Sequence, residues 1–300
     1  MTLISTIQNI NHSAKQKDKP LSLAVVKAAH DEVIESLREA INEGMVYAVL
    51  IDNKEALQKL IQKYQLPENS YEIVAEDSDE AASKLAVEMV KNGKANAIMK
   101  GHLSTGKLLK AVVDKEHGIR RSPLLSHVAV LYMPTLDRLV GFTDGGMVLE
   151  PSKEEMSIII DHAVEVMHSL NQVKPKVALL SATENVIPKL ASSKIEFDVV
   201  QENQREDCII EGPLSLDISL SPAIALDKGY SGAIQGDADI IVTPDIVSGN
   251  AVSKSLTLFG GAQMAGLIIG AQVPIILTSR SSSSEEKYAS ILLAKMMKSE

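Results

Sequence analysis

Short apolar runs alternate with longer segments of helical spacing along almost the whole chain. In the N-terminal part the apolar runs lie at residues 21–26, 47–51, 71–75 and 95–99. The segments of helical spacing follow at 30–43, 53–64, 77–92 and, after the polar loop 101–106, up to about residue 115. Such alternation is typical of βαβ units, and it predicts an α/β fold with a mostly parallel sheet flanked by helices.

The pattern changes at residues 126–143, where only the short turn Pro134-Thr135 separates two apolar runs. This spacing predicts an antiparallel hairpin rather than a crossover. We place a boundary between two lobes there, so that residues 1–135 belong to a first lobe and residues 136–264 to a second. Beyond the hairpin we expect helices at 153–170 and from the serine run 281–284 to the C-terminus, and strands at 176–180, 197–200, 208–211, 240–243, 265–269 and 275–278.

Size and composition exclude several classes of protein. Three hundred residues exceed one ordinary core, and a hydrophobic content of 45% is enough for a packed interior. A net charge of −9 argues against nucleic-acid binding, which needs a basic surface. The single cysteine, Cys208, cannot form an internal disulfide and indicates a reducing cytoplasm. We see no secretory signal, and the longest apolar stretch, 264–277, is too short and too interrupted to span a bilayer.

Polar residues gather where the predicted strands end. Asp245 and Asn250 follow the strand at 240–243, within the turn-rich segment 236–250. Open α/β sheets place their ligand sites at the carboxyl ends of strands, and a polar cluster there is costly to bury unless it binds something. Taken singly, Asp245, Asn250 and Asp217 could bind a ligand or could hold their loops as Asx turns and helix caps.

The loop Lys100-Gly101-His102-Leu103-Ser104-Thr105-Gly106-Lys107 lies between a predicted strand and a helix. It matches the first part of a P-loop, G-x-x-x-x-G-K, but Leu108 stands where a hydroxyl would hold Mg²⁺. A nucleoside triphosphate is therefore disfavoured. The backbone N–H groups, the Ser104 and Thr105 hydroxyls and the helix N-terminus still predict an anion cradle. The alternative is that one of these hydroxyls only caps the helix.

A second anion site is predicted at Ser279-Arg280, which closes the last strand. The planar guanidinium of Arg280 can bind two oxygens of a phosphate at once, beside hydroxyls and the first turn of a helix. Glu285 and Glu286 follow in that turn. They could act beside the arginine or could simply stabilise the helix N-terminus through its dipole.

These motifs together resemble the phosphate acetyl/butyryltransferase family, whose members exchange phosphate and coenzyme A on an acyl group. The motifs Met99-Lys100-Gly101 with Ser104-Thr105, and the segment 115–120, are more similar to its butyryl branch than to its acetyl branch. The similarity covers nearly the whole chain and is strongest at residues 99–120, 125–130, 211–229, 236–256 and 277–294.

The resemblance implies a two-lobed α/β fold shared with isocitrate and isopropylmalate dehydrogenases, with the active-site cleft between the lobes. Residues 265–300 would then return to complete the first lobe. It also implies a cytoplasmic homodimer or higher homo-oligomer that acts on small molecules, with coenzyme A or acyl-CoA as a substrate. No tightly bound cofactor, no metal, no nucleic acid and no membrane are implied.

The resemblance further implies direct acyl transfer in a ternary complex between a short-chain acyl-CoA, butyryl or branched-chain preferred, and phosphate. Ser279 and Arg280 would act at the reacting centre. The residues implied to bind phosphate or the acyl group are Lys100, Gly101, Ser104, Thr105, Ser126, Asp245 and Asn250. From charge alone we expect Lys107 and Arg120, with Lys110 and Arg121 as further candidates, to bind the nucleotide end of coenzyme A.

A general base is implied as well. The acetyl branch has an aspartate six residues after the arginine, an interval that here reaches Glu286, whereas Glu285 is the acid that butyryl-type sequences share. Either glutamate could take the proton. The alternatives are a phosphate acetyltransferase, a decarboxylating dehydrogenase of the same fold, and a non-catalytic ligand-binding protein.

Overall fold

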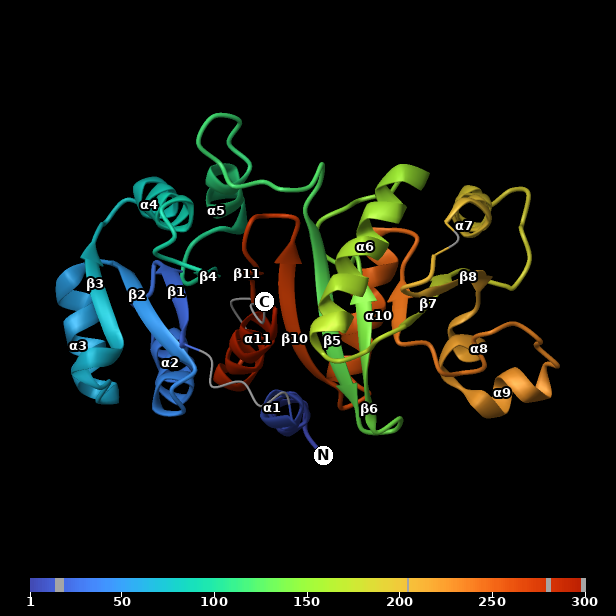
Figure 1. The fold of residues 1–300 in the computed structure, drawn as a ribbon, viewed down its shortest axis with the longest axis horizontal. Coiled ribbons are helices and arrows are strands. Elements are labelled where there is room, and N and C mark those ends of the chain that lie inside the picture. Colours follow the sequence, from blue (N-terminus) through green and yellow to red (C-terminus); the bar gives the residue numbers. More distant parts are fainter. Residues whose placement is uncertain (14–18, 204, 279–281, 298–300) are drawn as a thin grey trace. The chain divides into compact units, whose positions relative to one another are not determined.

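The computed structural model describes residues 1–13, 19–203, 205–278 and 282–297 of the chain. The chain divides into two compact units (Figure 1). The N-terminal unit contains Ile4–Leu125 with Ala265–Glu300, and the central unit contains Ser126–Met264 with Met1–Leu3. The division lies ahead of the boundary expected at residue 135, because the strand that begins at Ser126 pairs with the next strand and so joins the central unit.

The sheet of the N-terminal unit has the strand order β3-β2-β1-β4-β11-β10. Its strands are β1 (Leu21–Val26), β2 (Val46–Asp52), β3 (Tyr71–Ala75), β4 (Ala97–Lys100), β10 (Gln263–Ile269) and β11 (Ile275–Ile276). All pairs are parallel except β10 with β11. Its helices are α1 (Leu3–Ser13), α2 (Asp31–Asn42), α3 (Lys54–Tyr64), α4 (Asp79–Lys91), α5 (Thr105–Val112) and α11 (Ser284–Met296), with a 3₁₀ turn at Glu68–Ser70.

The strand order divides these helices into two groups. The crossovers from β1 to β2 and from β2 to β3 run in one direction along the sheet, whereas the crossover from β3 to β4 runs back past β1. Right-handed crossovers therefore put α2 and α3 on one face and α4 on the other. In agreement, α2 packs against α3 and α11, and α4 packs against α5 (Figure 1).

The central unit has the strand order β5-β6-β9-β7-β8. Its strands are β5 (Ser126–Met133), β6 (Arg138–Thr143), β7 (Lys176–Leu180), β8 (Ile209–Leu214) and β9 (Ile240–Val242). The pair β5 and β6 is antiparallel and the other pairs are parallel. Its helices are α6 (Lys153–Ser169), α7 (Ala191–Glu202), α8 (Leu216–Leu220), α9 (Pro222–Asp227) and α10 (Ile246–Leu258).

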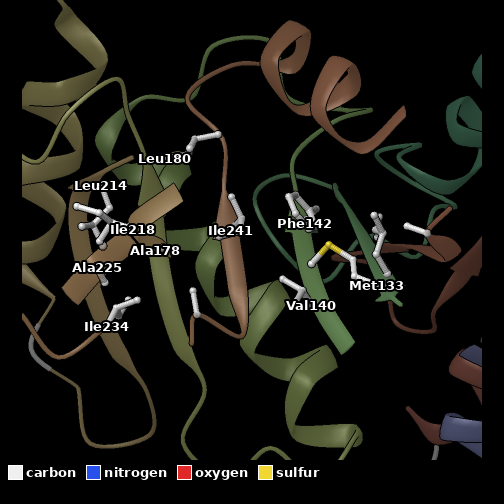
Figure 2. Packing of buried hydrophobic residues seen from close by; sticks show 14 residues of the cluster. Met133, Val140, Phe142, Ala178, Leu180, Leu214, Ile218, Ala225, Ile234 and Ile241 are labelled. Carbon is white, nitrogen blue, oxygen red and sulfur yellow. The ribbon is translucent and has the colours of Figure 1, made fainter. Parts of the chain in front are cut away.

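One face of this sheet forms a buried core of aliphatic side chains around Phe142 and Ile241 (Figure 2). Ile218 of α8 and Ala225 of α9 pack into this cluster, and Val252 of α10 lies at its margin. The other two helices of the unit are α6 and α7. Helix α6 contacts β5, β6 and β9 and packs against α7. The sheet is thus covered by helices on both faces, which is why its strands read as nearly continuous apolar runs.

The predicted α/β fold with a mostly parallel sheet and the predicted hairpin at 126–143 are confirmed. The strand predicted at 197–200 is wrong, because these residues belong to α7. The β-branched pair Val199-Val200 suggested a strand, but Ser193, Glu196 and Val199 are buried at a helical interval. Within the described part of the chain, no helix combines the length and the apolar character needed to cross a membrane.

Candidate functional site

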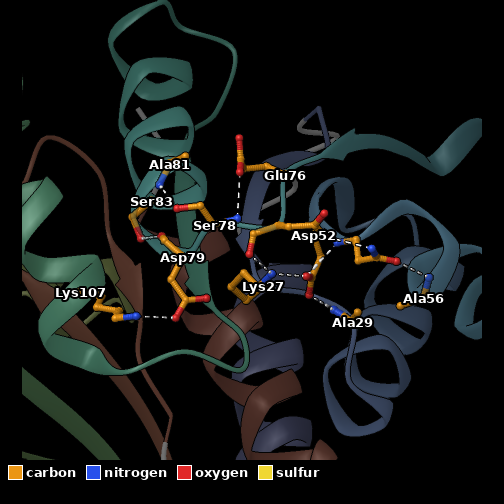
Figure 3. A network of polar contacts seen from close by, with 12 residues as sticks. Lys27, Ala29, Asp52, Ala56, Glu76, Ser78, Asp79, Ala81, Ser83 and Lys107 are labelled. Atoms are coloured by element: carbon orange, nitrogen blue, oxygen red, sulfur yellow. Dashed lines mark hydrogen bonds and ion pairs between the residues drawn. The ribbon is translucent and has the colours of Figure 1, made fainter.

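Charged side chains meet at the carboxyl ends of the parallel strands in the N-terminal unit (Figure 3). Lys27 follows β1 and forms an ion pair with Asp52, the last residue of β2. The Lys27 ammonium also donates to the Asp77 carbonyl oxygen, 3.2 Å away, just beyond β3. Asp52 accepts hydrogen bonds from the N–H groups of Ala29 and Asn53, both at 2.8 Å. This network ties the loops after three neighbouring strands into one edge.

The loop after β4 enters this edge at Gly101. A Cβ atom on Gly101 would lie 2.0 Å from the Lys27 carbonyl oxygen, so only glycine allows the two backbones to approach so closely. The preceding Lys100 is buried, and its ammonium donates to the carbonyl oxygens of Gly101 (3.3 Å) and Leu103 (3.2 Å). Lys100 therefore holds the shape of the loop that precedes α5.

The predicted anion cradle coincides with the N-terminus of α5. Ser104 is the N-cap and accepts from the Lys107 N–H at 3.4 Å, and Thr105 is the first helical residue. The Lys107 ammonium forms ion pairs with Asp79 (3.0 Å) and Glu80 (3.2 Å) at the start of α4. The hydrogen bonds that the ammonium donates to these two carboxylates raise the pKa of Lys107. The ammonium is thus already partnered.

Two histidines and an ion pair with a buried lysine lie beside this loop. The rings of His30 and His102 are stacked, with centroids 5.0 Å apart and an interplanar angle of 3°. Lys287 of α11 is buried, and its ammonium lies 3.2 Å from a carboxylate oxygen of Glu32 in α2. These four residues, with Lys100, Gly101 and Thr278, line a cavity of about 20 Å³, which is about the space one water molecule needs.

Ser279 and Arg280, predicted as central to the site, lie outside the described residues, between Thr278 and Ser282. The helix that follows them is well defined. Ser283 caps α11 by accepting from the Glu286 N–H at 3.2 Å, so Glu285 and Glu286 occupy the first helical turn. The Lys287 ammonium donates to the carbonyl oxygen of Ser282, the residue at which the described chain resumes.

The central unit has its own polar cluster at the ends of β6 and β9. Asp144 is buried, and its carboxylate accepts from the N–H groups of His127 (2.9 Å), Gly146 (2.7 Å) and Met147 (2.8 Å). Desolvation lowers the pKa of His127, while the Asp144 carboxylate opposes this shift. A buried aspartate that accepts three backbone hydrogen bonds therefore lies beside an imidazole that favours its neutral form.

The loops after β6 and β9 are in close contact at two glycines. A Cβ on Gly249 would lie 2.4 Å from the Asp144 carbonyl oxygen, and one on Gly145 would lie 2.9 Å from the Gly249 carbonyl carbon. Asn250 is exposed and donates to the Gly145 carbonyl oxygen at 3.1 Å. Asp245 caps α10, accepting from the Ser248 N–H (2.8 Å) and hydroxyl (2.7 Å).

The remaining predicted residues lie elsewhere. Ser126 is buried at the start of β5, and its hydroxyl is 2.7 Å from Nδ1 of His162 in α6, so it connects a strand to a helix. Arg120 is exposed and makes an isolated backbone bridge with Ala271. Lys107 lines a larger groove, of about 600 Å³, between α4 and α5.

Sequence reasoning missed three features of these edges: the stacked pair His30 and His102, the buried Lys287, and Asp144. Only Asp144 carries a local signal in the sequence, because it follows an apolar strand and precedes two glycines. His30 and Lys287 each meet a partner that is remote in sequence, His102 or Glu32. No local pattern marks them.

Comparison of the chain with known proteins identifies one family. Residues 69–295 match the family model described as phosphate acetyl/butaryl transferase. The chain is 39% identical to a probable phosphate butyryltransferase of Bacillus subtilis, covering 92% of this chain and 93% of that protein. It is 36% identical to a phosphate butyryltransferase of Clostridium acetobutylicum, covering 94% and 95%. It is 34% identical to a phosphate acetyltransferase of Thermotoga maritima, covering 96% and 98%.

Solved structures show the same relationship. A branched-chain phosphotransacylase from Enterococcus faecalis V583 superposes with a TM-score of 0.84 at 35% identity, covering 92% of this chain and 98% of that one. A 4-hydroxythreonine-4-phosphate dehydrogenase from Klebsiella pneumoniae shares the fold alone, with a TM-score of 0.59 at 13% identity over 93% and 99% of the two chains. The chain belongs to the phosphate acetyl/butaryl transferase family.

Proposed function

We propose that this protein converts a short-chain acyl-CoA and phosphate into an acyl phosphate and coenzyme A, and catalyses the reverse reaction. The observation that carries the proposal is the family match over residues 69–295. Butyryl and branched-chain acyl groups are the preferred substrates. Three relatives support this preference: the two butyryltransferases, and the branched-chain phosphotransacylase whose fold matches at 35% identity.

A phosphate acetyltransferase is the second candidate, and the Thermotoga maritima relative of that name, at 34% identity, favours it. The two candidates share one chemistry and differ in the space beside the acyl carbon. Each added methylene is worth only about 1–3 kcal/mol in a hydrophobic pocket, so the preference for one chain length is graded.

The reaction proceeds by direct transfer. The coenzyme A thiol loses its proton to a carboxylate, and its sulfur attacks the carbonyl carbon of the acyl phosphate. The tetrahedral intermediate then expels phosphate as the C–O bond breaks. General-base help matters because a thiol of pKa about 8.5 is mostly protonated at neutral pH. Glu285 or Glu286 accepts the proton, from the first turn of α11.

Arg280 and Ser279 hold the phosphoryl oxygens, and the backbone N–H groups and hydroxyls at Ser104 and Thr105 add further donors. The supporting observation is the anchoring of the chain on both sides of this pair. Thr278 lines the cavity with Lys100 and Gly101, and the Ser282 carbonyl oxygen accepts from the buried Lys287. A guanidinium between two anchored residues can be positioned at the carboxyl ends of β4 and β11.

The proposal includes the two-lobed architecture of isocitrate and isopropylmalate dehydrogenases, with the active-site cleft between the lobes. The fold likeness to the Klebsiella pneumoniae dehydrogenase supports it. Polar clusters at the strand ends of both units also support it, since Asp245, Asn250 and Asp144 lie at such an edge in the central unit. Coenzyme A is a substrate, and no tightly bound cofactor takes part.

We also propose that the protein is a cytoplasmic homodimer or higher homo-oligomer. The supporting observation is α10, which buries only Gly249 completely and leaves large apolar side chains exposed at its two ends. Val247, Leu258 and Phe259 are 72%, 72% and 86% exposed. The only charged residue in α10 is Lys254, so two chains of net charge −9 could pair there without carboxylates of α10 meeting at the contact.

One assay tests the proposed function. Purified protein is given acetyl-, butyryl- and branched-chain acyl-CoA in turn, with and without phosphate, and the release of free thiol is measured. We expect phosphate-dependent release that is fastest with butyryl or branched-chain substrates. The acetyl substrate being fastest would favour the second candidate, and the absence of release with all of them would overturn the proposed function.

A further inference from the structure

His127 lies at the carboxyl edge of the parallel strands in the central unit. It is the second residue of β5, and because β5 runs antiparallel to β6, the start of β5 lies beside the end of β6. Successive side chains of a strand point to opposite faces of the sheet. The Ser126 hydroxyl meets His162 of α6 on one face, whereas His127 shares the other face with Ala129 and Leu131 of the aliphatic core.

The loop after β6 holds His127 in two ways. The Asp144 carboxylate accepts from the backbone N–H of His127 at 2.9 Å, and from those of Gly146 and Met147 at 2.7 Å and 2.8 Å. Gly146 lies against the imidazole, because a Cβ there would be 3.3 Å from Cγ of His127 and 3.6 Å from its Nδ1. One carboxylate thus ties the strand to the loop that covers the ring.

The imidazole that is held in this way keeps its own hydrogen-bonding groups free. Neither ring nitrogen of His127 makes a hydrogen bond within the described residues, and the residue is partly exposed. Its polar neighbours at this edge are engaged, since Asp245 caps α10 and the Asn250 amide donates to the Gly145 carbonyl oxygen. A positioned side chain with a free donor at a strand edge is available to a ligand.

The protonation state of His127 suits a particular kind of ligand atom. Desolvation lowers the pKa of His127, although the Asp144 carboxylate opposes this shift, so the neutral ring is favoured. A neutral imidazole carries one N–H donor and one acceptor nitrogen. Such a donor stabilises negative charge that develops on an oxygen during a reaction, and it attracts a phosphate group less strongly than an imidazolium would.

The proposed reaction creates such a charge. When the coenzyme A sulfur bonds to the carbonyl carbon of the acyl phosphate, the second electron pair of the C=O bond moves to the oxygen. It returns when the C–O bond to phosphate breaks. In the proposed mechanism Ser279, Arg280 and the N-terminus of α5 hold the phosphoryl oxygens, so the carbonyl oxygen still needs a donor.

We infer that His127 is a further catalytic residue, whose ring N–H donates a hydrogen bond to the carbonyl oxygen of the acyl group. This bond is strongest in the tetrahedral intermediate, and the inference rests on the proposed function. His127 keeps its proton throughout, because the thiol proton goes to Glu285 or Glu286. Asp144 and Gly146 are positioning residues, since they act on the ring through the strand and the loop.

The kinetics of acyl transfer from butyryl phosphate to coenzyme A test this role. We expect His127→Ala to lower kcat about 10²–10³-fold and to change the KM for butyryl phosphate less than about threefold. His127→Gln keeps an N–H donor and should be about tenfold faster than His127→Ala. His168→Gln, which removes an exposed imidazole from α6 of the same unit, is the control and should keep wild-type constants. An unchanged kcat in folded His127→Ala, or a loss confined to KM, overturns the inference.

A measurement on the wild-type protein provides the test if His127→Ala does not fold. The probe is the phosphonate analogue of butyryl phosphate in which a methylene group replaces the bridging oxygen, so that the carbonyl remains but the acyl group cannot be transferred. We expect this analogue to shift the ring-nitrogen NMR signals of His127, which are assigned from their absence in His127→Gln. Inorganic phosphate should leave them unchanged. Binding of the analogue without a shift, or an equal shift with phosphate alone, overturns the inference.

The failure of this inference differs from the failure of the proposed function. A wild-type protein that transfers no acyl group refutes the proposed function, and the role of His127 with it. An active wild-type protein whose His127→Ala variant is equally fast refutes only the role of His127.

Discussion

Lys287 and Glu32 form an ion pair of 3.2 Å that connects α11 to α2 at the carboxyl edge of the N-terminal sheet. The lysine is buried, and its ammonium also donates to the Ser282 carbonyl oxygen. The pair therefore joins two helices and the end of the loop that carries Ser279 and Arg280. We therefore expect the pair to affect catalysis by positioning the chain at Ser282, without contact to a substrate.

Replacing Lys287 with Met should remove both contacts and leave the Glu32 carboxylate and the Ser282 carbonyl without their donor. We expect the free energy of unfolding to fall by about 1–3 kcal/mol, measured by urea titration, together with a lower kcat. Lys63→Met, which removes a lysine from the exposed pair with Asp31, is the control and should change little. Unchanged stability and kcat in Lys287→Met would contradict the positioning role.

Replacing Arg280 with Ala should lower the rate of acyl transfer by orders of magnitude, about 10²–10³, while the far-UV circular dichroism stays that of the wild type. Glu285→Gln and Glu286→Gln, made separately, identify the general base, because only the variant that lacks the base should lose turnover near neutral pH. A wild-type rate in the arginine variant would remove Arg280 from the site. Full activity in both glutamine variants would show that neither Glu285 nor Glu286 is the general base.

Replacing Gly101 with Ala should disturb the strand-end loop, since the new Cβ would lie 2.0 Å from the Lys27 carbonyl oxygen. We expect a loss of about 1–3 kcal/mol in the free energy of unfolding and a strong loss of activity. Gly106→Ala is the matched control within α5, because a Cβ there meets no atom within 4 Å. It should be neutral or slightly stabilising.

Glu196 on α7 is buried, and neither carboxylate oxygen has a hydrogen-bond partner within the described residues. Burial raises its pKa from 4.5 to about 7. The neutral form is therefore favoured in the folded protein, and the free energy of unfolding should fall by up to about 3 kcal/mol as the pH rises from 4.5 to 7. Chemical denaturation across this range should show the slope, and Glu196→Gln should flatten it.

Replacing the exposed Phe259 with Glu should split the proposed oligomer, because each copy would then bring a new carboxylate to the same apolar surface. Sedimentation velocity should report a smaller species with an unchanged circular dichroism spectrum. Leu226→Glu, on α9 and 80% exposed, is the control and should leave the oligomer intact. A wild-type protein that sediments as a monomer would contradict the proposed homo-oligomer.

Much of the fold could be predicted from the sequence because the strands are short β-branched runs bounded by polar turns. The helices α8, α9 and α10 could not. The first two are only 5 and 6 residues long, and α10 combines Gly249, several serines and exposed apolar residues without a clear apolar face. Its side chains follow no inside–outside pattern, and this pattern is the main signal that sequence reasoning uses.

The candidate site was predictable only where a motif is local. The loop 100–107 was recognised from its glycines and hydroxyls, and its position before α5 agrees with that prediction. The partners of the charged residues at this edge were not predictable, because Lys107 of the loop meets acids on α4 and Lys27 after β1 meets Asp52, both distant in sequence. Such pairs depend on which strands are neighbours in the sheet.

The glycines that bring the loops after β6 and β9 together have a consequence for any redesign of this edge. Because Gly145 and Gly249 leave no space between the two backbones, a bulkier residue in one loop displaces the other. Neither loop can be reshaped on its own. Libraries that alter this edge should vary residues 144–147 and 245–250 jointly, with both glycines kept fixed.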